Sequence, residues 1–191
     1  MKNSRTCIRY YYATTLMTTL TKQALIDMIK QAFGGVPMPL PEKLMVGGKW
    51  PIDMVQKGQT WDDQAGIASL LLEKQWQQVD FEKISDESAP FSMMTPEAVH
   101  YYLPAFLIYA ITNPETANTE TLRMELSSSP FSYCTLEEVE KRYSFLTLPQ
   151  RKAVAHYLEY VRERPEYDTM YPASEDPIDC VTNYWHDNYL T

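Results

Sequence analysis

The sequence predicts an all-α protein, a compact bundle of about five to seven helices around a kinked central helix, with little or no sheet. Two observations carry this prediction. Apolar residues recur at the period of a helix in several separate segments, and four segments begin with residues that can cap a helix N-terminus. Prolines and glycines gather between these segments, where helices have to end.

The first sixteen residues differ in character from the rest of the chain. They contain Lys2, Arg5 and Arg9 but no acidic residue, and they are rich in tyrosine and threonine. We expect residues 1–16 to form an N-terminal arm, which is either disordered or the product of a start placed too early. A helical domain over 17–165 and an acidic, aromatic tail over 166–191, packed on that domain, are predicted to follow.

The first helix is expected after Thr19 or Thr21, either of which can cap it. Its helically spaced apolar residues are Leu20, Leu25, Met28, Ile29, Ala32 and Phe33. Gly34 and Gly35 then predict a left-handed stop. The segment 36–58 holds four prolines and three glycines, so we expect a surface loop without a long element there.

The central helix has the clearest signals. Thr95 can serve as its N-cap, Pro96 stands at its first position, and the sequence breaks at Asn113 and Pro114. Apolar residues occur all round this helix, which predicts that it is the most buried one. Pro104 lies inside it and predicts a kink.

Other helices are expected on both sides of the central one. Thr60 or Asp62 can cap a helix that ends near Glu73. The remaining helices are predicted after Pro114, after the capping boxes at 135–138 and 147–150, and after Pro177.

The charge distribution argues against nucleic acid as a partner. The chain carries 17 Lys and Arg against 25 Asp and Glu, a net charge of −8. Proteins that bind nucleic acid neutralise phosphates with clustered basic residues, and here no run of Lys or Arg exceeds two neighbours. The tail has no basic Lys or Arg after Arg164 and several acids, so a charged partner is expected to be a basic protein.

No membrane segment is predicted. The longest apolar run, Tyr101 to Ile111, is about half as long as a bilayer crossing needs. Cys7, Cys134 and Cys180 are odd in number and far apart, which fits a reducing compartment and provides no CxxC unit. We therefore expect a cytoplasmic protein that does not bind membranes, and the sequence does not predict its oligomeric state.

Three segments carry a resemblance. TPEAVHYYLPAFLIYAI at 95–111, Trp76 in EKQWQQV, and LTLPQRKAVAHYLEYV at 146–161 are together similar to a family of uncharacterised, mainly bacterial proteins, with Tyr102–Leu107 as the most specific part. The resemblance runs from about Lys22 to Val161 and leaves out the tail after Pro165. Because that family has no assigned reaction, the resemblance implies a compact, bacterial-type domain and transfers no catalytic residue.

Two residue pairs have the spacing of metal ligands on a helix. Glu97 and His100 match the Glu-x-x-His motif of di-iron proteins, whereas His156 and Glu159 reverse its order. Solvated or capping side chains explain both pairs better. Zinc-ligand motifs and nucleophile motifs are also missing, so we predict no catalytic, cofactor-binding or metal-binding residue.

Aromatic residues are in excess, with 14 Tyr and 4 Trp, and both types are common in interface hot spots. In the tail they alternate with acids, and its rings can pack inward while its carboxylates face a partner. The residues predicted to bind that partner are Glu175, Asp176, Asp179, Tyr184 and Asp187. The expected function is a non-catalytic protein-interaction protein, inhibitor-like or immunity-like, that binds a basic protein. The alternative is a small hydrolase or metal-dependent enzyme that uses Glu97 and His100.

Overall fold

The computed structural model describes residues 20–84, 90–114, 126, 141, 143–162, 185 and 188–190. Its α-helices are α1 (Lys22–Phe33), α2 (Lys49–Gln56), α3 (Asp63–Leu71), α4 (Phe81–Ile84), α5 (Pro90–Met93), α6 (Pro96–Thr112) and α9 (Leu148–Arg162). Short 3₁₀ helices η1 and η2 cover Pro41–Lys43 and Trp76–Gln78. The β-pairing within the described residues is an isolated bridge between Met45 and Met94, so the predicted all-α class is confirmed.

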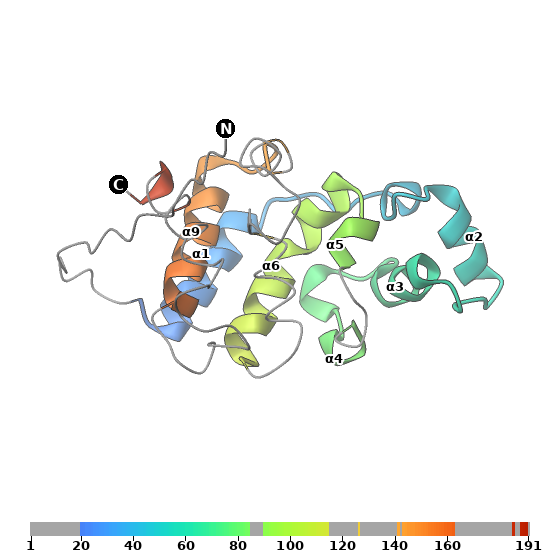
Figure 1. Ribbon diagram of the computed structural model, residues 1–191, viewed down its shortest axis with the longest axis horizontal. Helices are drawn as coiled ribbons and strands as arrows, with labels where there is room; N and C mark the ends of the chain where they lie inside the picture. The colour runs from blue at the N-terminus through green and yellow to red at the C-terminus, as the bar shows by residue number, and fades with distance from the viewer. Residues whose placement is uncertain are drawn as a thin grey trace, which may run out of the picture.

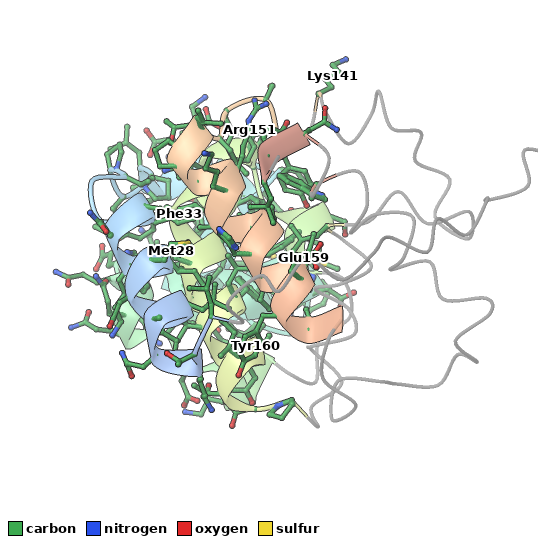
Figure 2. The ribbon with its side chains drawn as sticks, turned by 90° about the vertical axis from the view of Figure 1, so that its left-hand side faces the viewer. Met28, Phe33, Lys141, Arg151, Glu159 and Tyr160 are labelled. Atoms are coloured by element: carbon green, nitrogen blue, oxygen red, sulfur yellow. The ribbon has the colours of Figure 1, made fainter. Side chains whose placement is uncertain are left out.

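Three long helices form the centre of the molecule. Helix α6 packs against α1 and α9, which also pack against each other (Figure 1 and Figure 2). Buried side chains occur on all sides of α6, from Ala98 to Ile111. This confirms the prediction that it is the central helix, and Pro104 lies inside it, itself buried. None of the described helices combines the length and the apolar character that a membrane span requires.

The N-terminal cap of α6 is the predicted Thr95, and at α1 and α3 the structure selects Thr21 and Asp62 from the two candidates predicted for each. The Thr95 hydroxyl accepts a hydrogen bond from the Ala98 amide at 3.2 Å, and Thr21 does the same for the first turn of α1. The Asp62 carboxylate accepts from the Gln64 amide at 3.0 Å. Each cap satisfies a backbone donor that the helix itself leaves without a partner, so these boundaries follow from local chemistry.

The predicted left-handed stop after α1 is wrong. Gly34 has a φ of −61° in the right-handed region, and the positive φ angles of described glycines belong to Gly48 and Gly58. A Cβ added at Gly34 would lie 3.0 Å from the Lys30 carbonyl oxygen. The glycine therefore permits a close approach to the preceding turn and does not supply a left-handed conformation.

The segment 36–58, predicted to be a surface loop, contains the eight-residue helix α2. It also contributes Leu44, Met45 and Ile52 to the hydrophobic core. The prediction failed because Pro51 stands in the first turn of α2, where a helix does not need the missing N–H. Counting prolines without their helix positions therefore concealed this element.

Residues 36–72 form what we call the α2–α3 lobe. Helix α2 packs on α3 and on η1, at the end of the molecule opposite α1 and α9 (Figure 1). The lobe joins the centre through backbone contacts, including the Val46 amide to the Met93 carbonyl at 2.9 Å. The Tyr102 hydroxyl also contacts the carbonyl oxygens of Leu71 and Lys74, at 2.7 and 3.0 Å. Tyr102 thus binds the end of α3 to α6.

The C-terminal residues that the structure describes pack on the centre. Trp185 is buried, and its indole N–H donates to the Leu126 carbonyl at 3.3 Å. The Arg151 guanidinium donates to the Tyr189 hydroxyl at 3.0 Å and to the carbonyls of Leu146 and Ser144. The helices predicted after Pro114 and from the capping box at 135–138 lie largely outside the described residues.

Candidate functional site

The residues predicted to bind a partner lie outside the part of the chain that the structure describes. These residues are Glu175, Asp176, Asp179, Tyr184 and Asp187. The same holds for the cysteines at 7, 134 and 180. Their roles therefore stay predictions, and the described surface has to be considered on its own.

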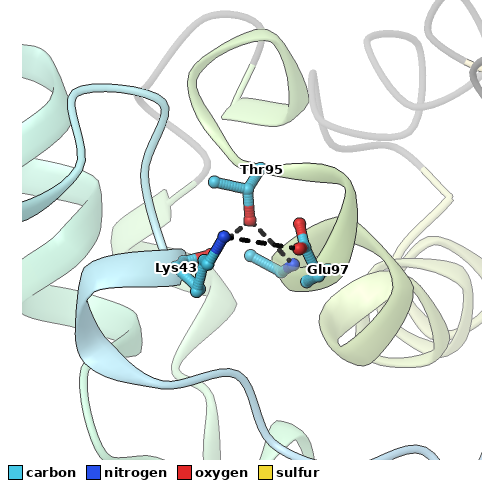
Figure 3. Close-up of polar contacts among 4 residues, drawn as sticks. Lys43, Thr95 and Glu97 are labelled. Carbon is cyan, nitrogen blue, oxygen red and sulfur yellow. Dashed lines mark hydrogen bonds and ion pairs between the residues drawn. The ribbon is translucent and has the colours of Figure 1, made fainter.

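Glu97 lies in the first turn of α6 and faces a lysine. Its Oε1 atom is 3.9 Å from the Lys43 ammonium, and both side chains are more than half exposed (Figure 3). The Thr95 hydroxyl bonds to the Lys43 carbonyl beside this pair. A carboxylate here suits the positive end of the helix dipole, and an exposed ion pair adds little stability. The contacts of Glu97 therefore serve the helix start.

His100 is partly buried, and its Nε2 atom lies 3.0 Å from the Gln150 amide oxygen. The same oxygen accepts the Thr147 backbone N–H at 2.9 Å, which fixes the orientation of the amide. Because an amide oxygen only accepts, the His100 Nε2 atom must carry a hydrogen. This nitrogen then has no lone pair for a metal ion. His100 connects α6 to the start of α9.

The partner of His100 was not predicted from the sequence. The sequence places Gln150 in the capping box of α9, where its side chain does accept from Thr147. Gln150 is nevertheless buried, with 3% of the residue exposed. A capping glutamine whose second contact crosses to another helix has no signature along the chain.

His156 and Glu159 lie on α9 and are partly buried, and each makes an interaction within the protein. Among the residues that the structure describes, no group of three or more His, Cys, Asp and Glu side chains is placed to hold a metal ion. Neither Glu-His pair therefore belongs to such a group in this part of the chain.

The most conspicuous surface feature is a set of exposed apolar side chains on the α2–α3 lobe. Their exposed fractions are Met38 48%, Leu40 63%, Val46 57%, Trp50 52% and Trp61 77%. Among the described residues outside the lobe, Leu148 on α9 is a large apolar residue that is exposed in the same way. Sequence reasoning missed this set because it assigned the segment to a loop. The available signal was the concentration of large apolar residues between prolines, without helical spacing.

The two exposed tryptophans are carried by neighbouring helix starts. Trp50 is in the first turn of α2, and Trp61 directly precedes Asp62, the N-cap of α3. The Gly47 amide donates to the Gln64 side-chain oxygen at 2.9 Å, which joins these two helix starts. A Cβ at Gly47 would lie 2.9 Å from the Pro51 ring as well as close to that oxygen, so a larger residue would crowd the start of α2. The backbone that carries both rings is therefore fixed.

The charges around these tryptophans are mixed. The charged residues of this part of the lobe are Glu42, Lys43, Lys49, Asp53, Lys57, Asp62 and Asp63. Positive and negative groups nearly balance, so the lobe itself has no strong electrostatic preference. What it offers to a partner is apolar contact area.

A family model described as "Family of unknown function (DUF6714)" matches residues 21–189. The match extends past Pro165, so the expectation that the tail lies outside the shared sequence was wrong. Trp185 and Tyr189 lie within the matched region, and both pack against the core of the protein. No curated protein and no solved structure matches the chain.

Proposed function

We propose that this chain, which belongs to the DUF6714 family of unknown function, is a non-catalytic protein that binds another protein. In this proposal it is of bacterial type and works in the cytoplasm as an inhibitor or immunity-like partner of a basic protein. The observation that carries the proposal is the exposure of Trp50 and Trp61 on the α2–α3 lobe.

Exposed tryptophans on a fixed backbone are suited to binding. Burying a large aromatic ring removes much apolar area from water, and Trp is among the residues enriched in binding hot spots. The lobe holds Trp50 and Trp61 on helix starts joined through Gly47 and Gln64. A partner would therefore not have to order the backbone when it binds, which lowers the entropy cost of association.

The proposed partner presents an apolar patch flanked by Lys and Arg. The protein has a net charge of −8, and many of its acids are in the tail. In the proposal, the lobe supplies apolar anchors while Glu175, Asp176, Asp179 and Asp187 attract the basic flanks and Tyr184 adds an aromatic contact. Long-range attraction of this kind raises the association rate more than the final affinity.

The test begins with affinity capture by the full chain and identification of the bound protein, whose affinity is then measured with purified components. We expect Trp50→Ala and Trp61→Ala each to weaken binding by about tenfold or more. Leu148→Ala is the matched control, because Leu148 is 58% exposed but lies on α9. An affinity unchanged in both tryptophan variants would refute the lobe as the binding surface.

The contribution of the tail is tested separately. The combined variant Glu175→Gln, Asp176→Asn and Asp179→Asn should slow association at low salt and leave the melting temperature nearly unchanged. The difference should shrink as salt rises, since the Debye length falls from about 30 Å at 0.01 M to about 10 Å at 0.1 M. If the wild type and the combined variant associate at equal rates at both salt concentrations, the tail has no part in the proposal.

The alternative proposal, a small hydrolase or metal-dependent enzyme that uses Glu97 and His100, has less support. Glu97 is paired with Lys43, and the His100 Nε2 atom is engaged by Gln150. Metal analysis of protein purified without a His-tag tests this alternative. Stoichiometric iron, manganese or zinc that is lost in Glu97→Gln and in His100→Ala would favour the enzyme over the interaction protein.

A further inference from the structure

A cavity of about 570 Å³ lies between α5, the start of α6 and the turn before α9. The residues that line it are Phe91, Ser92, Met94, Pro96, Val99, Lys141, Tyr143, Ser144 and Phe145. It shares no residue with the exposed set on the α2–α3 lobe. Its volume lies within the usual range of small-molecule pockets, about 300–1,000 Å³.

The floor of this cavity is apolar and well supported. Phe91, Met94, Val99 and Tyr143 are all buried. The Phe91 ring packs edge-on against Phe106, with ring centroids 4.6 Å apart. Such contacts hold the floor in place, so the cavity is already formed before a ligand enters.

The side walls are supported from behind by other elements. The Tyr143 ring contacts Trp185 at 6.0 Å between centroids, and the Phe145 ring contacts His100 at 5.0 Å. The hydrogen bond from His100 to Gln150 fixes that imidazole in turn. The turn that forms one wall is therefore tied both to α6 and to the C-terminal residues.

The described residues at the rim of the cavity are mostly polar and include no acid. Ser92, Pro96, Lys141 and Ser144 are exposed there, and Lys141 is the charged residue among the described residues that line the cavity. Figure 2 shows the Lys141 side chain extending outward at the edge of the described structure. Its ammonium group is therefore in water at the mouth and can turn toward a ligand head group.

The start of α6 also lies at the rim. Pro96 is the first residue of α6, so the positive end of the helix dipole lies at the rim. Glu97, the acid next in the chain, is directed toward Lys43 at 3.9 Å. Among the described residues that line the cavity, a carboxylate of a ligand would thus meet Lys141 and the start of α6 and no acid.

We propose that this cavity binds a medium-chain aliphatic carboxylate. The hydrocarbon chain lies on the floor of Phe91, Val99 and Tyr143, and the carboxylate stays at the rim beside Lys141. The ammonium group of Lys141, the charged residue among the described lining residues, matches a single negative charge. A doubly charged phosphate would call for more basic residues, such as the arginine forks that commonly bind it.

The test is calorimetric titration of the full chain with decanoate and, separately, with decanol, both below their aggregation concentrations. Decanol has a chain of the same length without the charge. We expect one saturable site for decanoate. Lys141→Met should weaken decanoate about fivefold and leave decanol within about twofold of the wild type. Lys152→Met, which removes an exposed lysine on α9, should change neither.

Ser92→Trp tests the location of the site. Ser92 is exposed, so a large ring is tolerated by the fold and covers the mouth of the cavity. It should weaken both ligands about tenfold or more while the melting temperature and the circular dichroism spectrum stay those of the wild type. Absence of saturable decanoate binding, or binding unchanged in Ser92→Trp, overturns the proposal. If Lys141→Met and Lys152→Met bind decanoate with the same affinity, the carboxylate does not lie beside Lys141.

Discussion

The centre of the molecule and the α2–α3 lobe use apolar residues for different purposes. In the centre, the long helices α1, α6 and α9 face one another, and α6 buries its apolar residues on all sides. In the lobe, two short helices bury Ile52 and Ile67 but leave Trp50 and Trp61 exposed. The amount of apolar side chain in a segment therefore does not say whether it serves stability or contact with a partner.

The exposed residues of the lobe are not a sign of poor folding. The lobe contributes buried residues to the same hydrophobic core as the long helices. It is also joined to them through Tyr102 and through the backbone contact of Val46 with Met93. A segment that can bury Leu44 and Met45 beside an exposed Val46 has a defined inner and outer face.

The largest difference between the two regions is expected from the same substitution, Leu to Asp, made in each of them. Leu107 on α6 is 0% exposed, whereas Leu40 in the lobe is 63% exposed. Leu107→Asp buries a charge without a partner and should cost more than about 4 kcal/mol of unfolding free energy. Leu40→Asp should change it by less than about 0.5 kcal/mol. Urea unfolding measures both, and similar losses in the two variants would contradict the contrast.

Tryptophan gives the second comparison. Trp185 is 2% exposed and donates to the Leu126 carbonyl, whereas Trp61 is 77% exposed. Trp185→Ala should lower the unfolding free energy by about 3 kcal/mol or more, because it leaves a large cavity. Trp61→Ala should leave stability nearly unchanged, so that its effect appears in partner binding alone. Thermal and chemical unfolding separate the two cases, and a stable Trp185→Ala variant would show that the ring is not an anchor.

Glutamine provides a smaller, polar comparison. Gln150 is buried and accepts from Thr147 and His100, while Gln64 accepts from the Gly47 amide at a more exposed place. Gln150→Ala removes the shared acceptor of two partly buried hydrogen bonds and should cost about 2 kcal/mol. Gln64→Ala should cost about 1 kcal/mol or less, because water can replace its oxygen. Urea unfolding measures both variants. A larger loss of unfolding free energy in Gln64→Ala than in Gln150→Ala would contradict the expectation that the buried glutamine contributes more to stability.

The smallest expected effect concerns the contact between the regions. Tyr102→Phe removes the hydroxyl that bonds to Leu71 and Lys74, and it should cost about 1 kcal/mol. Amide hydrogen exchange should show faster opening at the end of α3, with α9 unaffected. Equal protection of α3 in both proteins would mean that the hydroxyl does not connect the lobe to the centre.

The difference in stability between the wild type and Tyr102→Phe has a pH dependence of known sign. Burial raises the pKa of Tyr102 above its ordinary value, with a smaller contribution from Tyr101. An exposed tyrosine in the unfolded chain loses its proton near pH 10. Above that pH the unfolded state binds fewer protons at this position, so the wild type loses stability as pH rises. Tyr102→Phe lacks this loss, and the stability gap between the two proteins should narrow from pH 8 to pH 10.5.

Much of the helical architecture could be predicted from the sequence. The caps at Thr21, Asp62 and Thr95 and the central place of α6 all followed from local signals. The errors were the stop at Gly34 and the missing helix α2. Both arose where a glycine or proline has more than one structural use, and the sequence does not say which use applies.

The candidate sites were less predictable. The sequence drew attention to Glu97 and His100 because of their spacing, and their partners turned out to be Lys43 and Gln150. These partners are distant along the chain, so no spacing rule could have found them. The exposed lobe and the cavity beside Phe91 also depend on which elements pack together.

The sequence by itself determined the helical class, the Thr95 cap, the central helix and the net charge, because each depends on residue type and on neighbours within a few positions. Only the tertiary structure decided which apolar residues stay in water. Trp61 and Trp185 are the same residue, but one precedes a short helix at the end of the lobe and the other enters the core. That difference arises from packing between segments far apart in the chain, which local sequence patterns do not encode.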